Sequence, residues 1–398
     1  MNVASGVRVV EPGGTIGILG GGQLGRMLAM VARRMGYRIH VVDRDPNCPT
    51  AQIADVHYCD SLADEDFRKR LARSVDVVTY EFEHLPIEAV EQLAQECPVF
   101  PPPVALRIAQ HRILEKTFLA SNGFPTAPFA PVRSEKDIRK AVVQIGTPCV
   151  LKAATFGYDG KGQIRIDSRK EAVAAWRALN VSEAILEKWI DFYAEFSVLL
   201  ARDKHGNTVV YPPIRNWHRH HILDVSVMPC GLPKVSMRDA TKVAKEIAHL
   251  LQFVGVLCVE FFIEPTGHVL VNEIAPRPHN SGHLTIEACV TSQFEQQLRA
   301  ICGLPLGAVK QRCPAAMANL LGDLWLPEPP LFSRVCQFPG VYLHLYGKVP
   351  AAPGRKMGHI TALASTAWQA LRRVRRARRA LRRKDGAVEI VKKMQEES

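Results

Sequence analysis

The sequence predicts an α/β region at the amino end, an α+β region after it, and a smaller unit near the carboxy end. In the first region, short apolar runs such as TIGILG (15–20) and RIHVVD (38–43) alternate with amphipathic stretches. This alternation is typical of a parallel, doubly wound sheet with Rossmann-like topology. In the second region, the apolar runs over 194–213 and 256–275 turn back through short polar segments, which predicts antiparallel hairpins.

The elements of the first region follow in a regular order. We expect strands where apolar residues are continuous and helices where they recur every three or four positions. The expected strands cover residues 15–20, 38–43, 76–82 and 98–102, and the expected helices cover residues 23–37, 66–75, 87–97 and 105–123. The α/β region therefore ends near residue 120.

The second region opens on the Pro-rich connection FPTAPFAPV (124–132). Its further strands are expected at residues 147–155, 164–167 and 184–190, and its helices at residues 239–255 and 291–303. The domain boundaries that follow are 1–120, 121–302 and 303–366, with a basic tail over 367–398.

Composition places the chain among ordinary globular proteins. Of its 398 residues, 47% are apolar and 23% charged. No apolar run is long enough to span a bilayer, and the first residues do not resemble a signal or transit peptide. The ten cysteines are scattered, without a C-x-x-C pair or zinc spacing, which favours reduced thiols in a cytoplasmic protein.

The net charge of +12 is concentrated near the carboxy end, where RRVRRARRALRRK (372–384) holds nine basic residues. Three interpretations of this basic tail stay open: an arm that binds nucleic acid or another polyanion, a solvated basic helix, or a segment outside the folded body. No other part of the chain suggests a nucleic-acid partner, and no part suggests a membrane partner.

The stretch GILGGGQLGRM contains three glycines, Gly20, Gly22 and Gly25, in the G-x-G-x-x-G pattern of dinucleotide-binding folds. A strand, a glycine turn and a helix start place backbone N–H groups around an anion. Asp43 ends the next strand, about where an acid that binds ribose would lie. The pattern alone leaves a dinucleotide, another phosphate ligand and a purely structural turn open.

A second glycine-rich segment, GYDGKGQ (157–163), follows Lys152 on the preceding strand. Its backbone can approach phosphate oxygens closely, and Lys152 and Lys161 add two positive charges. The chain contains no G-x-x-x-x-G-K-[ST] sequence, so this is not a Walker loop. The segment suits a triphosphate, with a surface hairpin as the alternative.

Two carboxylates stand in strands that are otherwise apolar, Glu260 in VLCVEFFI and Glu273 in VLVNEIA. A carboxylate among buried neighbours needs a cation or a donor. Two of them on adjacent strands, with Asn272 beside them, suit Mg²⁺ together with substrate phosphates. The alternative is a pair of outward-facing strand residues.

The loop APRPHNSGH (275–283) follows directly and contains many hydrogen-bond donors. Such a loop suits a small oxyanion or a phosphate, with a solvated turn as the alternative. Its donors are Arg277, His279, Asn280, Ser281 and His283.

Lys152, the GYDGKGQ loop, ILEKWI and the Glu260/Glu273 pair together resemble the ATP-grasp superfamily. Within it, the chain is similar to the N5-carboxyaminoimidazole ribonucleotide synthetases, the ATP-dependent carboxylases of purine biosynthesis. The similarity extends from residue 15 to about residue 365. It rests on GILGGGQLGRM, VVTYEFEH, FGYDGKGQ, NEIAPRPHNSGH, SQFEQQLRAI and HLYGKVPAAPGRKMGH.

The resemblance implies an ATP-grasp fold with a Rossmann-like domain before it and a small domain after it. It also implies ATP and two Mg²⁺ ions as cofactors, with the metals on Glu260 and Glu273. The residues implied to bind ATP are Arg107, Lys152, Gly157, Tyr158, Asp159, Gly160, Lys161, Gly162, Gln163, Glu187, Lys188, Trp189, Ile190, Glu195, His218, Asn272 and Glu273.

The implied reaction starts with the attack of bicarbonate on the γ-phosphate of ATP, which gives carboxyphosphate. The 5-amino group of aminoimidazole ribonucleotide then captures the carboxyl group. Asp159, Lys356 and Arg277 are implied to handle this intermediate. The residues implied to contact the ribonucleotide or bicarbonate are Gly22, Gln23, Leu24, Tyr158, Glu81, His279, Asn280, Ser281, Lys348 and Arg355.

The resemblance further implies a homodimer.

The Arg-rich end differs from the family pattern, because members of the family usually have a neutral or acidic carboxy end. Two other functions stay open: a different ATP-grasp ligase that joins a carboxylate to an amine, or a non-catalytic scaffold whose basic tail binds a polyanion.

Overall fold

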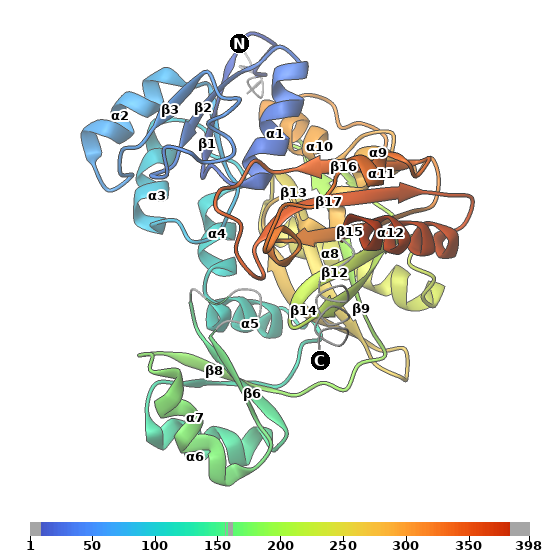
Figure 1. Ribbon diagram of the computed structural model, residues 1–398. Coiled ribbons are helices and arrows are strands. Elements are labelled where there is room, and N and C mark those ends of the chain that lie inside the picture. The colour runs from blue at the N-terminus through green and yellow to red at the C-terminus, as the bar shows by residue number, and fades with distance from the viewer. Residues whose placement is uncertain (1–8, 156, 158–161, 383–398) are drawn as a thin grey trace, which may run out of the picture.

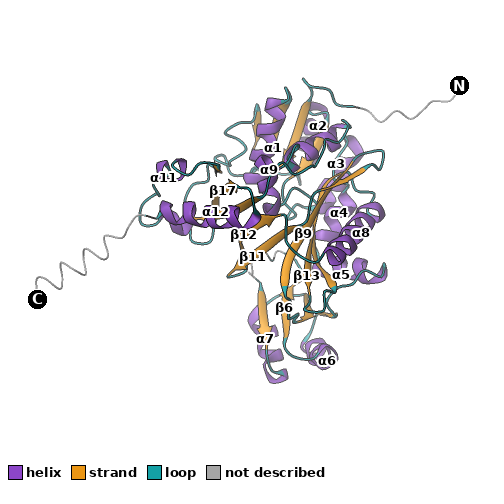
Figure 2. Cartoon of the chain, turned by 90° about the vertical axis from the view of Figure 1, so that its right-hand side faces the viewer, coloured by secondary structure: helices purple, strands orange, loops and turns teal. Residues whose placement is uncertain are grey.

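The computed structural model describes residues 9–155, 157 and 162–382. Its three sheets form an amino-terminal α/β domain, a small lobe and a large sheet (Figure 1). The lobe projects at the lower end of the molecule, and the turned view in Figure 2 shows it lying well away from α1 and α2. No helix in these residues is long and apolar enough to cross a membrane.

The amino-terminal domain contains the parallel sheet that the sequence predicts, in the strand order β3-β2-β1-β4. Apolar residues of α1 and of the strands, among them Ile16, Ile18 and Leu28, form its core. The strands are β1 (Thr15–Leu19), β2 (Arg38–Val42), β3 (Val56–Tyr58) and β4 (Val77–Tyr80). The helices are α1 (Gln23–Arg34), α2 (Glu65–Ser74), α3 (Ile87–Glu96), α4 (Pro103–Ala109) and α5 (Arg112–Ser121).

Two expectations for this domain were wrong. Residues 98–102 form no named strand and make only a single bridge, from Val99 to Val78. The single helix expected over 105–123 is two helices, because His111 has an extended backbone and its ring accepts the N–H of Leu114, which starts α5 afresh. The break changes which side chains of this stretch reach the cavity described below.

The small lobe is an antiparallel sheet in the order β5-β8-β6-β7, covered by two helices. Its own apolar cluster includes Val132, Ile138, Leu151 and Leu186. The strands are β5 (Phe129–Val132), β6 (Cys149–Ala153), β7 (Gln163–Ile166) and β8 (Ala184–Lys188), and the helices are α6 (Glu135–Ile145), α7 (Ala172–Leu179) and the 3₁₀ turn η1 (Arg169–Glu171).

The large sheet has the order β14-β13-β9-β11-β12-β15-β17-β16, with β10 paired to β9. Its strands are β9 (Ala194–Arg202), β10 (Thr208–Val210), β11 (Ile214–Arg219), β12 (Ile222–Met228), β13 (Gly255–Ile263), β14 (Val269–Ala275), β15 (Ala315–Leu321), β16 (Val341–Leu345) and β17 (Lys356–Leu363). The accompanying helices are α8 (Lys234–Leu250), α9 (Thr285–Ala288), α10 (Gln293–Cys302), α11 (Ser333–Cys336) and α12 (Ala367–Leu381), with the 3₁₀ turns η2 (Asn280–Leu284) and η3 (Gly322–Trp325).

The carboxy-terminal unit adds to this sheet instead of forming a separate one, because β15 pairs with β12. The expected start of the basic tail, residue 367, is the first residue of α12. Leu371, Val374 and Leu381 of α12 pack in the same apolar cluster as β15 and β17. The arginines up to residue 382 therefore belong to a packed helix, and the rest of the tail, 383–398, lies outside the described residues.

Candidate active site

A cavity of about 960 Å³ lies where the lobe, the large sheet and the amino-terminal domain meet. It collects side chains from segments that are far apart in the sequence. The predicted residues that line it are Gln23, Leu24, Glu81, Lys152, Gly157, Gln163, Glu187, Lys188, Trp189, Ile190, Glu195, His218, Glu260, Asn272, Glu273, Arg277, His279, Asn280 and Lys356.

In the lobe, Lys152 of β6 and Glu187 of β8 form an ion pair at 2.8 Å. The two strands are neighbours, and both side chains are largely buried. Burial alone raises the pKa of Glu187, but the charges of Lys152 and Lys116 outweigh it and lower this pKa to about 2. A permanent carboxylate and an ammonium group therefore lie side by side at the wall of the cavity.

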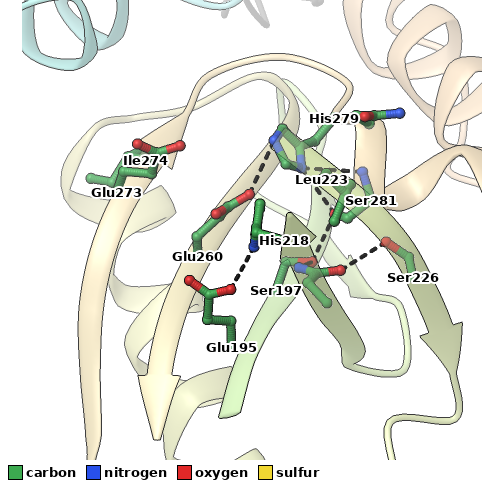
Figure 3. A network of polar contacts seen from close by, with 12 residues as sticks. Glu195, Ser197, His218, Leu223, Ser226, Glu260, Glu273, Ile274, His279 and Ser281 are labelled. Atoms are coloured by element: carbon green, nitrogen blue, oxygen red, sulfur yellow. Dashed lines mark hydrogen bonds and ion pairs between the residues drawn. The ribbon is translucent and has the colours of Figure 1, made fainter. Parts of the chain in front are cut away.

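On the large sheet, Glu195 of β9 is bonded to the ring Nδ1 of His218 of β11 (Figure 3). Burial lowers the pKa of His218, but the bond to Glu195 and the charge of Glu260 outweigh it, so the pKa is raised. The other oxygen of Glu195 takes no part in this bond and can accept from a ligand hydroxyl. The pair gives this wall of the cavity an oriented acceptor.

Glu260 and Glu273 are direct cross-strand partners on β13 and β14, and a register shift follows at Phe261. Directly opposed side chains lie on the same face of a sheet and interact. Burial and the charge of Glu273 raise the pKa of Glu260 to about 8. Because their negative charges repel each other, ionisation of both carboxylates is unfavourable. A divalent cation that prefers oxygen ligands offsets this repulsion, so the pair suits such an ion.

Helix α5 holds the strand segment around Glu273 with two buried charged residues. The carboxylate of Glu115 accepts the N–H of Ile274 at 2.6 Å, and the ammonium of Lys116 donates to the carbonyl of Asn272 at 2.7 Å. Burial raises the pKa of Glu115 to about 8 and lowers that of Lys116. Sequence reasoning missed both residues, although two adjacent charges in an apolar helix were a usable signal.

Arg107, expected at the ATP phosphates, does not line the cavity. It lies on α4, where its guanidinium binds both oxygens of Glu91 at 2.9 and 2.7 Å. Arg112, at the start of α5, lines the cavity instead, 3.8 Å from a carboxylate oxygen of Glu273 and 3.2 Å from the carbonyl of Gly157. The helix break at His111 separates the two arginines, which the continuous helix predicted from sequence could not show.

The glycine turn before α1 also differs from the expectation. The carboxylate of Glu81 accepts the N–H groups of Gly22 and Gly25, and Asp43 accepts that of Gly21 at 2.7 Å. The chain's own acids therefore occupy three N–H groups of the turn, and of the residues assigned to a ligand only Gly22 is among them. A Cβ on Gly20, whose φ is +97°, would lie 2.4 Å from the Phe82 ring, so close packing requires this glycine.

Four further residues that were expected at the site do not line the cavity. Ser281 is buried and bonded to Ser197 at 2.7 Å (Figure 3), while Lys348 lies over the ring of Tyr346 and Arg355 donates to the carbonyl of Pro350. Gly162, which was expected to bind ATP, does not line the cavity either. Tyr158, Asp159, Gly160 and Lys161 lie outside the described residues.

Two residues of the predicted donor loop are tied to the fold as well as to the cavity. Asn280 exchanges side-chain bonds with Asn319 of β15 at 3.0 and 2.6 Å. Arg277 pairs with Glu83 at 2.8 Å, and the pKa of Arg277 is raised because the acids around it outweigh the effect of burial. His283 does not line the cavity and is bonded to Gln293.

Cys258, Glu260 and His279 place potential metal-binding atoms within 4.8 Å of one another. The ring Nδ1 of His279 accepts the N–H of Ser281, so the proton is on Nε2, 3.1 Å from Glu260 (Figure 3). Burial also raises the pKa of the Cys258 thiol well above its usual value. A protonated thiol is a poor metal ligand, and His279 turns its Nε2 proton toward Glu260, so the carboxylate of Glu260 is the metal-binding group of the three.

Three family models cover most of the chain. The ribonucleotide synthetase preATP-grasp domain matches residues 14–110, the ATP-grasp domain matches 117–294, and the phosphoribosylaminoimidazole carboxylase C-terminal domain matches 315–373. N5-carboxyaminoimidazole ribonucleotide synthase of Brucella melitensis is 44% identical over 356 residues, which are 89% of this chain and 97% of the relative. The chain belongs to the N5-carboxyaminoimidazole ribonucleotide synthase family.

Two other relatives support this family membership. The synthase of Bacillus subtilis is 40% identical over 89% of this chain and 92% of its own length. The chain also spans 37% of a bifunctional purine synthesis protein of Dictyostelium discoideum, at 42% identity.

Solved structures of the family share the whole fold. An ADP complex of a synthetase is 40% identical, with a TM-score of 0.88 over 93% of this chain and 97% of the other. The Aspergillus clavatus enzyme in complex with ADP and aminoimidazole ribonucleotide is 32% identical, with a TM-score of 0.85 over 93% and 99%. The fold is thus an ATP-grasp fold between a preATP-grasp domain and a carboxy-terminal domain, and the chain is an ATP-grasp ligase.

Proposed function

We propose that this chain carboxylates 5-aminoimidazole ribonucleotide to N5-carboxyaminoimidazole ribonucleotide with ATP and bicarbonate, through carboxyphosphate, in purine biosynthesis. Family membership supports the overall reaction. The single structural observation that carries it is the opposed pair Glu260 and Glu273 in the same cavity as Lys152. Two carboxylates and a lysine in one cavity support phosphoryl transfer, which needs metal ligands and a cation near the phosphates.

The ATP subsite lies between the lobe and the large sheet. Lys152 and Arg112 neutralise phosphate charge, and the backbone of residues 188–190 lines the adenine pocket beside Glu187. Glu195, oriented by His218, accepts from the ribose hydroxyls. Two Mg²⁺ ions, held by Glu260 and Glu273 with Asn272 beside them, would neutralise the charge on the transferring phosphoryl group.

The second substrate occupies the part of the cavity toward the amino-terminal domain. Gln23 and Leu24 at the start of α1 face the ribonucleotide. Arg277, fixed by Glu83, holds carboxyphosphate while the amine attacks its carboxyl carbon and phosphate leaves. Lys356 and Asp159 take part in handling the intermediate and the amine proton, and the reaction requires that water be kept from carboxyphosphate.

One assay tests this function. ADP release should reach its full rate only when Mg²⁺, bicarbonate and aminoimidazole ribonucleotide are all present, and the carbamate should form in equal amount. If another amine substrate stimulates ADP release and aminoimidazole ribonucleotide does not, the chain is a different ATP-grasp ligase. If no amine or carboxylate stimulates it, the non-catalytic alternative gains support.

The homodimer and the cytoplasmic location are also part of this proposal. Sedimentation equilibrium of the purified chain tests the first and fractionation of the source cells the second. A monomer over the working concentration range contradicts the proposed dimer.

A further inference from the structure

Helix α12 carries side chains that neither the packing nor the proposed reaction uses. Its buried face packs against β15 and β17. Two arginines are also committed to the fold, because Arg378 pairs with Asp224 of β12 and Arg373 donates to the carbonyl of Leu363. The tryptophan and the other arginines of this segment are Trp368, Arg372, Arg375, Arg376 and Arg379 of α12 and Arg382 at its C-cap, and we call these six residues the Trp-Arg face.

Their spacing is one to four residues, and at 3.6 residues per turn the five on the helix fall within an arc of about 100°, so they lie along one side. Trp368 is 62% exposed at the amino end of the row. Four of the five arginines are exposed, and Arg375 is half-buried. From Arg372 to Arg382 the row is about 15 Å long, at the usual rise of a helix.

Among the residues that the structure describes, no acid pairs with the arginines of this face. Residues 367–382 contain seven arginines and no Asp, Glu or Lys. Within the ranges that the structure describes, no ion pair or side-chain hydrogen bond engages the five guanidinium groups of the Trp-Arg face. Five like charges on one helix are unfavourable among themselves, and a polyanion relieves this repulsion.

We propose that the Trp-Arg face binds single-stranded nucleic acid, with the guanidinium groups on successive phosphates and one base stacked on Trp368. The planar guanidinium fork matches a phosphate better than a lysine ammonium does. A linear row suits a linear polyanion, and an exposed aromatic ring beside cations is the arrangement that binds unpaired bases. A compact anion such as ATP would engage only part of the row.

A membrane surface fits this face less well. An interfacial helix needs an apolar side to insert, and that side of α12 is already buried in the fold by Leu371, Val374 and Leu381. Trp368 is the one large apolar side chain of the described helix that stays exposed.

The face is also separate from the cavity. The sheet lies between α12 and η2, as Asn319 of β15 shows. Its side chain bonds Asn280 of η2, and its carbonyl accepts from Arg378 of α12. Figure 1 shows α12 on the outer side of the carboxy-terminal strands. Nucleic acid on α12 therefore leaves the cavity accessible.

The test is fluorescence anisotropy of the full chain with a labelled 20-nucleotide RNA at several KCl concentrations. Five phosphate contacts predict a slope of about 3.5 for log Kd against log [KCl]. R372E/R376E/R379E should weaken binding at least 100-fold and lower this slope. W368A should weaken binding about tenfold and leave the slope unchanged, because it removes a base contact and no phosphate contact.

The matched control is R70E/R177E/R238E, which makes the same charge change at exposed arginines of α2, α7 and α8. This variant should bind RNA nearly as the parent does, and both triple variants should keep ADP release. Equal loss in the two triple variants overturns the proposal, as does unchanged binding by R372E/R376E/R379E. Binding to vesicles with 30% phosphatidylserine without binding to RNA assigns the face to a membrane and also overturns it.

Discussion

The carboxylate of Glu115 on α5 accepts the backbone N–H of Ile274 at 2.6 Å, one residue beyond the proposed metal ligand Glu273. This bond fixes the strand that carries Glu273 to a helix of the neighbouring segment. Glu115→Ala should destabilise the chain by about 1–3 kcal/mol, because a buried N–H loses its acceptor. Urea unfolding measures the loss, and Mg²⁺ titration of ADP release should show a higher requirement. Glu115→Gln retains an acceptor, so a loss as large as that of the alanine variant would contradict this role.

Glu273→Gln should abolish turnover while the midpoint of urea unfolding stays within a narrow range of the parent value. The substitution removes the charge that the metal requires but keeps the shape of a half-exposed side chain. Steady-state ADP release and circular dichroism measure the two properties. Normal turnover in this variant would contradict the proposal that Glu273 binds the metal.

Arg112→Ala should reduce kcat/KM for ATP by about 100-fold or more, because Arg112 lines the cavity beside Glu273. Arg107→Ala is the matched control, since Arg107 is engaged by Glu91 outside the lining. It should leave kcat/KM within about twofold. A larger loss of kcat/KM in Arg107→Ala than in Arg112→Ala would indicate that Arg107 contacts the phosphates.

The pKa of about 2 for Glu187 predicts an acid-sensitive contribution to stability. A carboxylate whose pKa is lower in the folded than in the unfolded state stabilises the fold above the unfolded value, and this contribution disappears as the pH falls toward the folded value. The charges of Lys152 and Lys116 on Glu187 thus contribute up to about 3 kcal/mol at pH 6, an upper limit. Unfolding free energies of the parent and Glu187→Gln should converge as the pH falls from about 5 to about 2. A gap independent of pH contradicts the assignment.

Lys356→Ala should lower formation of the carbamate more than it lowers ATP affinity, since Lys356 enters the cavity from β17 and Lys152 enters it from the lobe. Carbamate formation and ATP binding are measured separately, the second by calorimetry. A collapse of ATP affinity would place Lys356 in the ATP subsite.

The local pattern of the sequence predicted most elements around the site. Alternating apolar runs predicted β1, β2 and β4, and the two hairpins β9–β10 and β13–β14 were also predicted. Glu260 and Glu273 were expected on adjacent strands, and their direct register confirms this. These features depend on side chains near one another in sequence, where periodicity and turn residues are informative.

Contacts between distant segments could not be predicted in the same way. The sequence assigned the glycine turn to a ligand anion, but the N–H groups of Gly22 and Gly25 donate to Glu81, 56 to 59 residues away. The arginine at the cavity is Arg112 and not Arg107, because His111 ends one helix and begins another. The arginine run looked like a tail, whereas its small and aliphatic residues pack on a sheet that β12 and β15 share.

The sequence by itself thus determined most of the elements, the opposed acids Glu260 and Glu273 and the family, because these follow from periodicity, residue type and motif. The tertiary structure decided which charges meet: Glu81 with α1, Glu115 with β14, and Arg112 with Glu273. Those pairs join residues separated by tens to more than a hundred positions. Their energies depend on burial and distance, which exist only after the chain has folded.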